Sequence, residues 1–535
     1  MRALSPPASR EAEGGRLLVP VLGFCLLVST AAYLMVFTML GQIGAALHAS
    51  ATLANWIVIA TIITATVSAA LFPGLGSALG QRRLMVAAMA CLAVGSLVSA
   101  AAPDAATLLV GRVIAAPGFA ASSLSVAIVR EHVSVARLPR AFGVIAAYAG
   151  AAAGVGFTLG GLVEEAVRSD WHSVFLAMAA VSVITGVLAA VAIPGGKQPS
   201  RRADLAGGLL LAGGLVVALL PITEGAAWGW TSWRVIGLFA GALVLLAAWL
   251  ITELRRADPL VRLGALRLPG VAGGTLLFLV TAATVGVVNL TVPAFLEAPV
   301  AVGYGTGASV LNAGLDLLPF ALAIAAAGVL AGRLARWIPA RVIAMVTLAC
   351  EALALLLLAG FHHGGDQVVI LAAVFGLGHG GTIAVEYVLL TGAVPPTVVG
   401  GVTGVASAVD GVSGAVASAV TTGLLAVGLV RAHGMSLPSA ADYSRAWLVG
   451  AAVAASGALA VAVSAVRMRH LRQGSCVSSP GPVSSRELHW LYARKPISPG
   501  RTRRTARIPG KGTCVSRCPG IRPHGGRRRS HRGHR

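Results

Sequence analysis

The stretch PGLGSALGQRRLM (Pro73–Met85) lies between two long apolar segments and combines glycines with two adjacent arginines and no acidic residue. Each flanking segment is long enough to cross the ~30 Å hydrocarbon core of a bilayer, which takes about 20 helical residues. Basic residues in short loops mark the cytoplasmic side of a membrane protein. The stretch therefore predicts a tight cytoplasmic turn between two transmembrane helices.

The rest of the 535-residue chain repeats this pattern. Hydrophobic residues make up 56% of it and charged residues only 11%, and the mean hydropathy is +0.83. Because lipid offers the backbone no hydrogen-bond partners, long apolar segments must be helices. The first is too long and too similar to the others for a cleaved signal peptide. We therefore predict an all-α, polytopic transmembrane helical bundle of fourteen segments: Leu17–Leu40, Asn55–Ser77, Leu84–Ala102, Thr107–Val129, Ala141–Val163, Ser173–Ile193, Leu205–Ile222, Val235–Leu254, Val271–Val292, Ser309–Leu330, Val342–Phe361, Gln367–Ala393, Gly400–Leu425 and Trp447–Val466.

Basic residues predict the orientation of these segments. Up to Val466 and outside the segments, 18 Lys and Arg residues fall on one side and only four on the other. The positive-inside rule then places both termini in the cytoplasm, which agrees with an even number of segments. We expect a multi-pass protein of the cell membrane whose basic loops contact anionic lipid of the inner leaflet.

Two basic connections, PGGKQPSRRAD and LRRADPLVRLGALRLPG, flank the seventh and eighth segments. They predict two six-helix halves with two extra central helices between them. The expected divisions are a cytoplasmic N-terminus (1–16), a first half (17–193), the two extra helices with their linkers (194–270), a second half (271–466) and a basic tail (467–535).

The formal net charge of +22 comes largely from the tail, which is rich in Arg, Pro, Gly and Ser. That composition predicts disorder, and contact with the inner leaflet is favoured over binding of nucleic acid. Cys25, Cys91 and Cys350 are isolated thiols, and the tail motif CVSRC lacks the second ligand pair of a zinc site. Neither a metal site nor a disulfide framework is predicted.

The turn at Pro73–Met85 resembles the signature loop of the major facilitator superfamily, and so does AGRLARWIPAR after the tenth segment. Matching residues in the two loops are Leu75, Gly76, Gly80, Arg82, Arg83, Gly332, Arg333, Leu334, Ala335 and Arg341. Ser77 and Arg336 stand where the superfamily has an acid. A loop repeated after the second helix of each half is typical of transporters built from two parallel repeats. The resemblance implies a latch between the halves at the cytoplasmic surface.

Further stretches extend the resemblance over about Gly15 to Arg467. LLVGRVIAAPGFAAS is similar to the helix-four motif with Arg112 at its arginine, and GAAAGVGFTLGG to the helix-five antiporter motif. VGYGTGASVLNAGLDLLPFAL resembles the start of helix ten in the fourteen-helix drug:proton antiporter group. In AAYLMVFTMLGQI, Ala32 and Phe37 stand where that group usually carries Asp and Asn.

The fifth segment has small residues at four-residue intervals, a spacing that lets membrane helices pack backbone to backbone. The glycines predicted to pack in this way are Gly150, Gly154, Gly156, Gly160 and Gly161. The alternative to a packing role is that the abundance of Ala and Gly only reflects codon composition.

Ionisable residues at membrane depth are functional candidates because burying a charge there costs about 2.5–3.5 kcal/mol or more. The candidate proton-coupling acids are Glu351, Asp410, Asp316 and Glu386, and the candidate charges of a central cavity are Arg112 and His379. Glu351 and Asp410 are nearest to mid-span. Each has an alternative: Glu386 could reach the cytoplasmic surface, His379 could be a packing residue, and Asp316 could face a wet vestibule.

No nucleotide-binding or hydrolytic signature occurs, so neither an enzyme nor a cofactor is predicted. The leading hypothesis is proton-coupled export of hydrophobic or cationic small molecules, as in drug efflux, by a monomer that works by alternating access. A non-transporting sensor or scaffold with a transporter fold and a metabolite transporter remain as alternatives.

Overall fold

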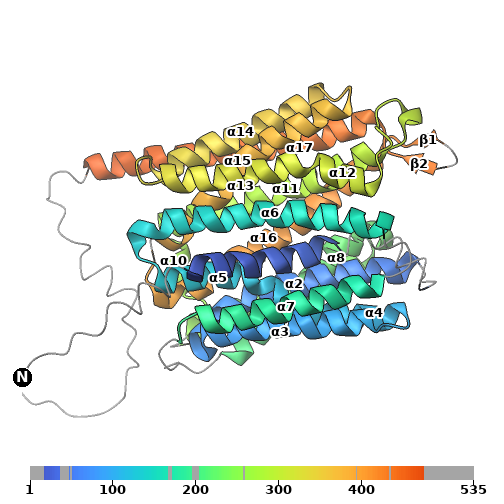
Figure 1. Ribbon diagram of the computed structural model, residues 1–535. Helices are drawn as coiled ribbons and strands as arrows, with labels where there is room; N and C mark the ends of the chain where they lie inside the picture. Colours follow the sequence, from blue (N-terminus) through green and yellow to red (C-terminus); the bar gives the residue numbers. More distant parts are fainter. Residues whose placement is uncertain are drawn as a thin grey trace, which may run out of the picture. The chain divides into compact units, whose positions relative to one another are not determined.

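The computed structural model describes residues 17–35, 47, 51–166, 171–195, 204–256, 259–392, 394–432 and 435–474. These residues are almost entirely helical (Figure 1). The helix Leu17–Met35 comes first. It is followed by α2 (Ala51–Leu79), α3 (Gln81–Ala100), α4 (Ala105–Ala115), η1 (Ala116–Ala120), α5 (Ala121–His132), η2 (Val135–Arg137), α6 (Leu138–Ala166), α7 (Trp171–Ala192), α8 (Leu205–Trp228), α9 (Trp233–Arg255), α10 (Leu263–Leu266), α11 (Pro269–Glu297), η3 (Val300–Val302), α12 (Val310–Asp316), α13 (Leu318–Leu334), α14 (Ala340–Gly360), α15 (Gly365–Gly392), α16 (Pro396–Leu425), β1 (Val430–Ala432), β2 (Met435–Leu437) and α17 (Ala440–Gly474).

Fourteen helical spans in the described part of the chain are long and apolar enough to cross a membrane. The predicted all-α polytopic bundle is therefore confirmed. Three spans combine shorter elements: α4 with η1 and α5, η2 with α6, and α12 with α13. The last helix runs on to Gly474, past residue 467 where the tail is expected to begin, and the division into two halves, extra helices and tail stays a prediction. Residues 1–16, 36–40 and 475–535, which include most of the predicted tail, lie outside the described residues.

The turn between α2 and α3 is shorter than predicted. Helix α2 continues through Pro73 to Leu79, and α3 begins at Gln81. Only Gly80 departs from the helical conformation, with φ of 93°, a value that glycine adopts at no steric cost. Membrane helices tolerate an internal proline because neighbouring groups satisfy the freed carbonyl. The GLGSAL stretch is thus helix and not loop.

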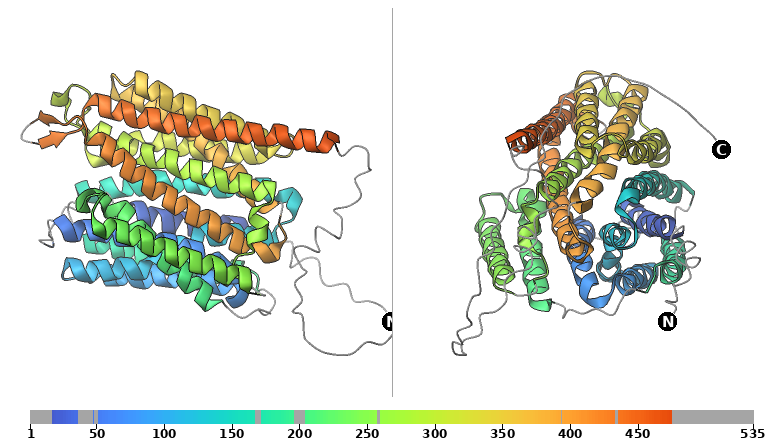
Figure 2. Two further views of the ribbon diagram at one scale, coloured as in Figure 1. Left: turned by 180° about the vertical axis from the view of Figure 1, so that it is seen from behind. Right: turned by 90° about the vertical axis from the view of Figure 1, so that its left-hand side faces the viewer.

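Helices of the two halves meet along two seams (Figures 1 and 2). Helix α6 packs along α13 and α12, and α2 packs along α16. A Cβ added to Gly143 on α6 would lie 2.7 Å from the carbonyl oxygen of Gly328, and one added to Gly404 on α16 would lie 2.1 Å from that of Ala70. Backbones approach this closely only where side chains are absent.

The two extra helices lie at the edge of the bundle, as the right-hand view of Figure 2 shows along the helix axes. Helix α8 packs on α9, α2 and α16. Between this pair and α11, α16 and α17 lies an apolar cavity of about 600 Å³, whose lining includes Leu215, Trp249, Val287 and Val412.

Candidate functional site

Two carboxylates of the second half lie where the halves meet. Asp410 on α16 is half-buried, and Glu386 on α15 is only 3% exposed. The two interact electrostatically, and Asp410 also acts on Tyr33 of the first helix and on Tyr387 of α15. The ring of Tyr387 in turn contacts that of Phe142 on α6, with centroids 5.5 Å apart. Asp410 therefore acts on a group of the first half, and Glu386 lies next in the chain to Tyr387, whose ring contacts that half.

Arg112 on α4 is the charge that the first half contributes. Its side chain is fully buried, and its Nη2 donates to the backbone oxygen of Ala32 at 3.3 Å. The guanidinium carbon lies 5.7 Å from the ring centroid of Phe119 and 5.8 Å from that of Phe175. Nε and Nη1 have no hydrogen-bond partner. The helix breaks one turn later because Pro117 lacks the N–H that would continue it.

Glu351 on α14 belongs to a different environment. It is fully buried inside the second half, and its two carboxyl oxygens accept hydrogen bonds from Thr284 on α11 and Thr382 on α15, each at 2.8 Å. Thr382 also lies 3.0 Å from the hydroxyl of Thr347. These bonds tie three helices of one half together. The structure thus separates Glu351 from Asp410, although the sequence ranks them alike.

The other two predicted charges lie apart from the seam acids. His379 is 5% exposed and stacks on Phe375 with centroids 5.6 Å apart, which favours a packing role. Asp316 is exposed at the break between α12 and α13. Among the described residues no three His, Cys, Asp or Glu side chains gather as a metal site requires.

The glycines of the fifth span lie on α6 at close contacts. A Cβ on Gly150 would meet the backbone oxygen of Ala321 at 2.7 Å, and one on Gly154 the side chain of the same residue at 2.9 Å. Gly156 faces the first helix, and Gly161 faces the start of α12. Gly160 is buried. Four of these glycines thus lie where α6 touches another element.

At the end of the bundle that holds the α2–α3 turn, which we call the basic end, the predicted latch residues do not share one contact. Gly76 is buried beside the Gln81 side chain, and Leu75 is half-buried. Arg82, Arg83 and Arg333 are exposed, and Arg341 is half-buried. Their action as a latch stays a prediction.

A family model described as Major Facilitator Superfamily matches residues 22–418. The chain belongs to this superfamily. The resemblance predicted from the two glycine-and-arginine loops is thereby confirmed.

Curated relatives of this superfamily protein include efflux and resistance proteins. The chain is 31% identical over 227 residues to the "MFS-type efflux pump MMF1" of Pseudozyma antarctica, and the matched region covers 41% of each chain. The chain is 28% identical over 292 residues to the methylenomycin A resistance protein of Streptomyces coelicolor, and the matched region covers 54% of this chain and 59% of the relative. The chain thus spans about two fifths to three fifths of the length of these relatives.

Solved structures share the fold. The human organic anion transporter MFSD10 (TETRAN) superposes with a TM-score of 0.55 over 86% of this chain and 99% of its own, at 18% sequence identity. At that identity the likeness concerns the fold alone.

In this superfamily member a direct contact joins the halves at the basic end. Arg130, in the last turn of α5, donates from Nε to the backbone oxygen of Thr391 at 3.0 Å and from Nη2 to that of Val394 at 2.9 Å. Both acceptors lie at or just after the end of α15. Sequence reasoning missed this contact because its acceptors are backbone atoms.

The linker after the extra helices crosses the second seam at the same end. Leu260 lies against α2, where a Cβ on Gly74 would be 2.8 Å from its Cδ1. The backbone oxygen of Leu260 lies 2.5 Å from where a Cβ on Gly401 of α16 would stand. One linker residue thus touches both halves.

Buried acids anchor this linker. Glu253 on α9 is 3% exposed and accepts the Val261 N–H at 3.4 Å. Asp204 caps α8 by accepting the Gly207 N–H at 2.8 Å and forms an ion pair with Arg256. We call Asp204, Glu253, Arg256, Leu260 and Val261 the linker clamp. Sequence reasoning missed it because Glu253 reads as a polar residue at a helix end.

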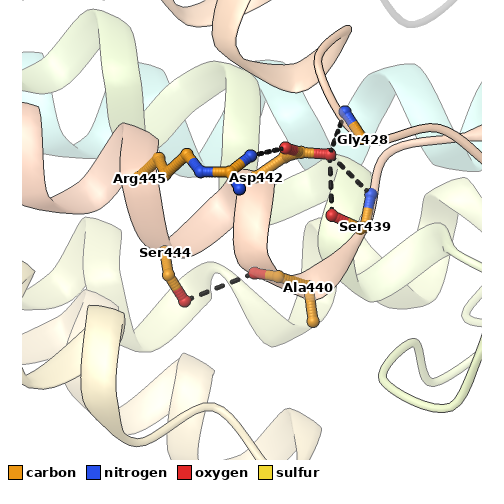
Figure 3. Close-up of polar contacts among 6 residues, drawn as sticks. All are labelled: Gly428, Ser439, Ala440, Asp442, Ser444 and Arg445. Atoms are coloured by element: carbon orange, nitrogen blue, oxygen red, sulfur yellow. Dashed lines mark hydrogen bonds and ion pairs between the residues drawn. The ribbon is translucent and has the colours of Figure 1, made fainter.

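The opposite end of the bundle contains a second polar cluster, at the start of α17 (Figure 3). Asp442 is fully buried and accepts hydrogen bonds from the backbone of Gly428 and from the backbone and hydroxyl of Ser439. Its other oxygen pairs with Arg445 at 2.5 Å. Nearby, Tyr304 donates to the Pro438 oxygen at 2.5 Å, and burial raises the pKa of this phenol. Neither group faces the seam acids, so we assign this cluster to structure.

Proposed function

We propose that this transporter exports hydrophobic small molecules in exchange for protons, by alternating access to a site between its halves. The observation that carries the proposal is Asp410, which interacts electrostatically with Tyr33 of the first half and with the buried Glu386 of its own half. The apolar cavity beside α16 and the efflux relatives support a hydrophobic substrate. We further propose a cell-membrane location, cytoplasmic termini, contact of the basic loops with anionic lipid, and a monomer.

A carboxyl group between the halves suits proton exchange. In a dry environment the neutral form of a carboxyl is favoured, whereas water access favours the charged form. Rocking of the halves would change the water access of Asp410, which is half-buried at the seam, more than that of Glu351, which threonines enclose within one half. One oxygen of the buried Glu386 has no hydrogen-bond partner. We therefore assign coupling to Asp410 first and to Glu386 second.

The test compares neutral isosteres in membrane vesicles. We expect Asp410→Asn to abolish uphill efflux driven by a pH gradient and to leave downhill exchange measurable, because the substitution keeps the shape and removes the titration. Asp316→Asn is the matched control, since Asp316 is exposed and remote from the seam acids. Proton antiport is wrong if Asp410→Asn and Glu386→Gln both pump like the wild type with unchanged pH dependence. A protein that shows no flux of any compound would instead support the sensor or scaffold alternative.

A further inference from the structure

Arg112 is a buried cation without a counter-anion. It is fully enclosed, and the ion pairs seen among the described residues join Asp204 to Arg256 and Asp442 to Arg445. A guanidinium has five N–H donors, yet the one acceptor in place is the Ala32 backbone oxygen, and Nε and Nη1 have none. Such a group is expensive to bury, so its presence calls for a function.

The aromatic neighbours account for only part of the cost. Phe119 and Phe175 both lie within cation–π range of the guanidinium. Ring faces stabilise the charge, but they leave the in-plane N–H groups without acceptors. An acidic oxygen is the chemistry that satisfies both the charge and the donor fork, because two parallel N–H···O bonds can form.

The residue that contacts Arg112 does not itself supply such an acidic oxygen. Ala32 offers Arg112 only its backbone, since its side chain is a methyl group. The next residue, Tyr33, is half-buried and lies within electrostatic range of both Arg112 and Asp410. The ring centroids of Tyr33 and Phe119 lie 5.3 Å apart, so Tyr33 shares this aromatic neighbour with Arg112, and Asp410 acts on Tyr33 from the second half.

We propose that Arg112 binds an acidic oxygen, a carboxylate or phenolate, of the exported molecule, so that the substrates are hydrophobic organic anions. This inference rests on the proposed export function and names its substrate class. Binding requires the Tyr33 side chain to move aside, which places the acidic group against the guanidinium and the apolar body between the halves. Asp410 remains free for the proton.

Two substitutions at position 32 provide a test, because the variants differ from each other by one charge. Ala32→Asp supplies an internal carboxylate beside Arg112, and Ala32→Asn has the same shape without the charge. The probe is 2-naphthoate, with 2-naphthamide as its neutral match, and the readout is the ligand-induced shift in thermal unfolding of the purified full-length protein. We expect the wild type and Ala32→Asn to bind 2-naphthoate, and Ala32→Asp to bind it about tenfold or more weakly, as loss of a charge-assisted hydrogen bond implies. Binding of 2-naphthamide should not separate the two variants.

A second pair keeps the test decisive if bulk at position 32 prevents folding. Arg112→Lys and Arg112→Gln differ in charge at the same place, and only the lysine variant should retain naphthoate binding. Equal binding by both members of the pair that folds would overturn the inference, as would stabilisation by chloride with none by naphthoate, or a preference for a cationic probe such as tetraphenylphosphonium. Binding needs no pH gradient, so naphthoate binding without proton-driven export would overturn the proposed function and not this inference.

Discussion

Replacing Gly150 on α6 by alanine should weaken the seam with α13. The added Cβ would lie 2.7 Å from the Ala321 oxygen and 2.8 Å from the Ala325 nitrogen, whereas ordinary contacts begin at 3.4 Å. Both neighbours are backbone atoms and cannot rotate away, so the helices must separate by about 0.7 Å. Overpacking of this kind costs about 1–3 kcal/mol, and the better helix propensity of alanine returns at most about 1 kcal/mol. We therefore expect the cost of the clash to exceed the gain in helix propensity, so that the substitution lowers the free energy of unfolding.

Gly414→Ala is the matched control, because Gly414 is also within a seam helix and a Cβ there meets nothing within 4 Å. The propensity gain is common to both variants, so the difference in their free energies of unfolding isolates the clash at about 1–3 kcal/mol. Thermal unfolding in lipid nanodiscs and efflux from vesicles are the measurements. We expect Gly150→Ala to melt below Gly414→Ala and to transport more slowly. Equal melting temperatures and equal rates would refute the close approach of α6 and α13.

Three further predictions follow from the loops and the linker. Reporter fusions at Gly229 and at Arg472 should give opposite readings, because the seven spans between the two sites would place them on opposite sides of the membrane, and like readings would contradict this count. Hydrogen bonds from Thr107 hold the pKa of Asp104 below its usual value, so this N-cap stabilises the protein above the ordinary aspartate range and the effect is lost as the pH falls through the lowered value. Asp104→Ala should therefore destabilise at neutral pH and not in acid, whereas Asp104→Asn should show less pH dependence in unfolding experiments. Leu260→Ala should lower the unfolding free energy by about 2 kcal/mol, the lower end of the range for buried leucines, because Leu260 is half-buried. Leu263→Ala on α10 is a control in the same linker, and equal effects of the two would contradict the contact of Leu260 with both halves.

The number and type of helices could be predicted because membrane spans are encoded by length and hydrophobicity. The rotation of each helix about its own axis, which decides the face that it turns to each neighbour, could not be predicted. Asp410 and Glu351 lie at similar depth in apolar segments, and hydropathy does not say that one faces the first half while the other bonds Thr284 within the second. Helices that are apolar all round carry little information about which face meets which neighbour. The threonines and Tyr33 were missed for this reason.

Turn positions were predicted less well than spans. The Pro73–Met85 stretch has the composition of a loop, yet α2 continues through Pro73, and Gln81 at the start of α3 donates to the Pro73 oxygen at 3.3 Å. Helix α2 therefore ends two residues beyond the predicted segment, at Leu79, and a single residue separates it from α3. The glycines of the stretch serve close packing, and only Gly80 serves the turn itself.

The linker clamp gives a physical reason for the departure at Ser77, where the superfamily loop has an acid. A carboxylate is still present at the basic end, but it comes from the extra helices: Glu253 holds the Val261 N–H, and the adjoining Leu260 lies between α2 and α16. Arg130 joins the halves independently through α5 and α15. Because α2 and α16 must separate for the basic end to open, the linker has to leave Gly74 or Gly401 in that step. The two extra helices would then take part in alternating access, and an insertion between two repeats would have taken over a contact that the loop residues no longer make.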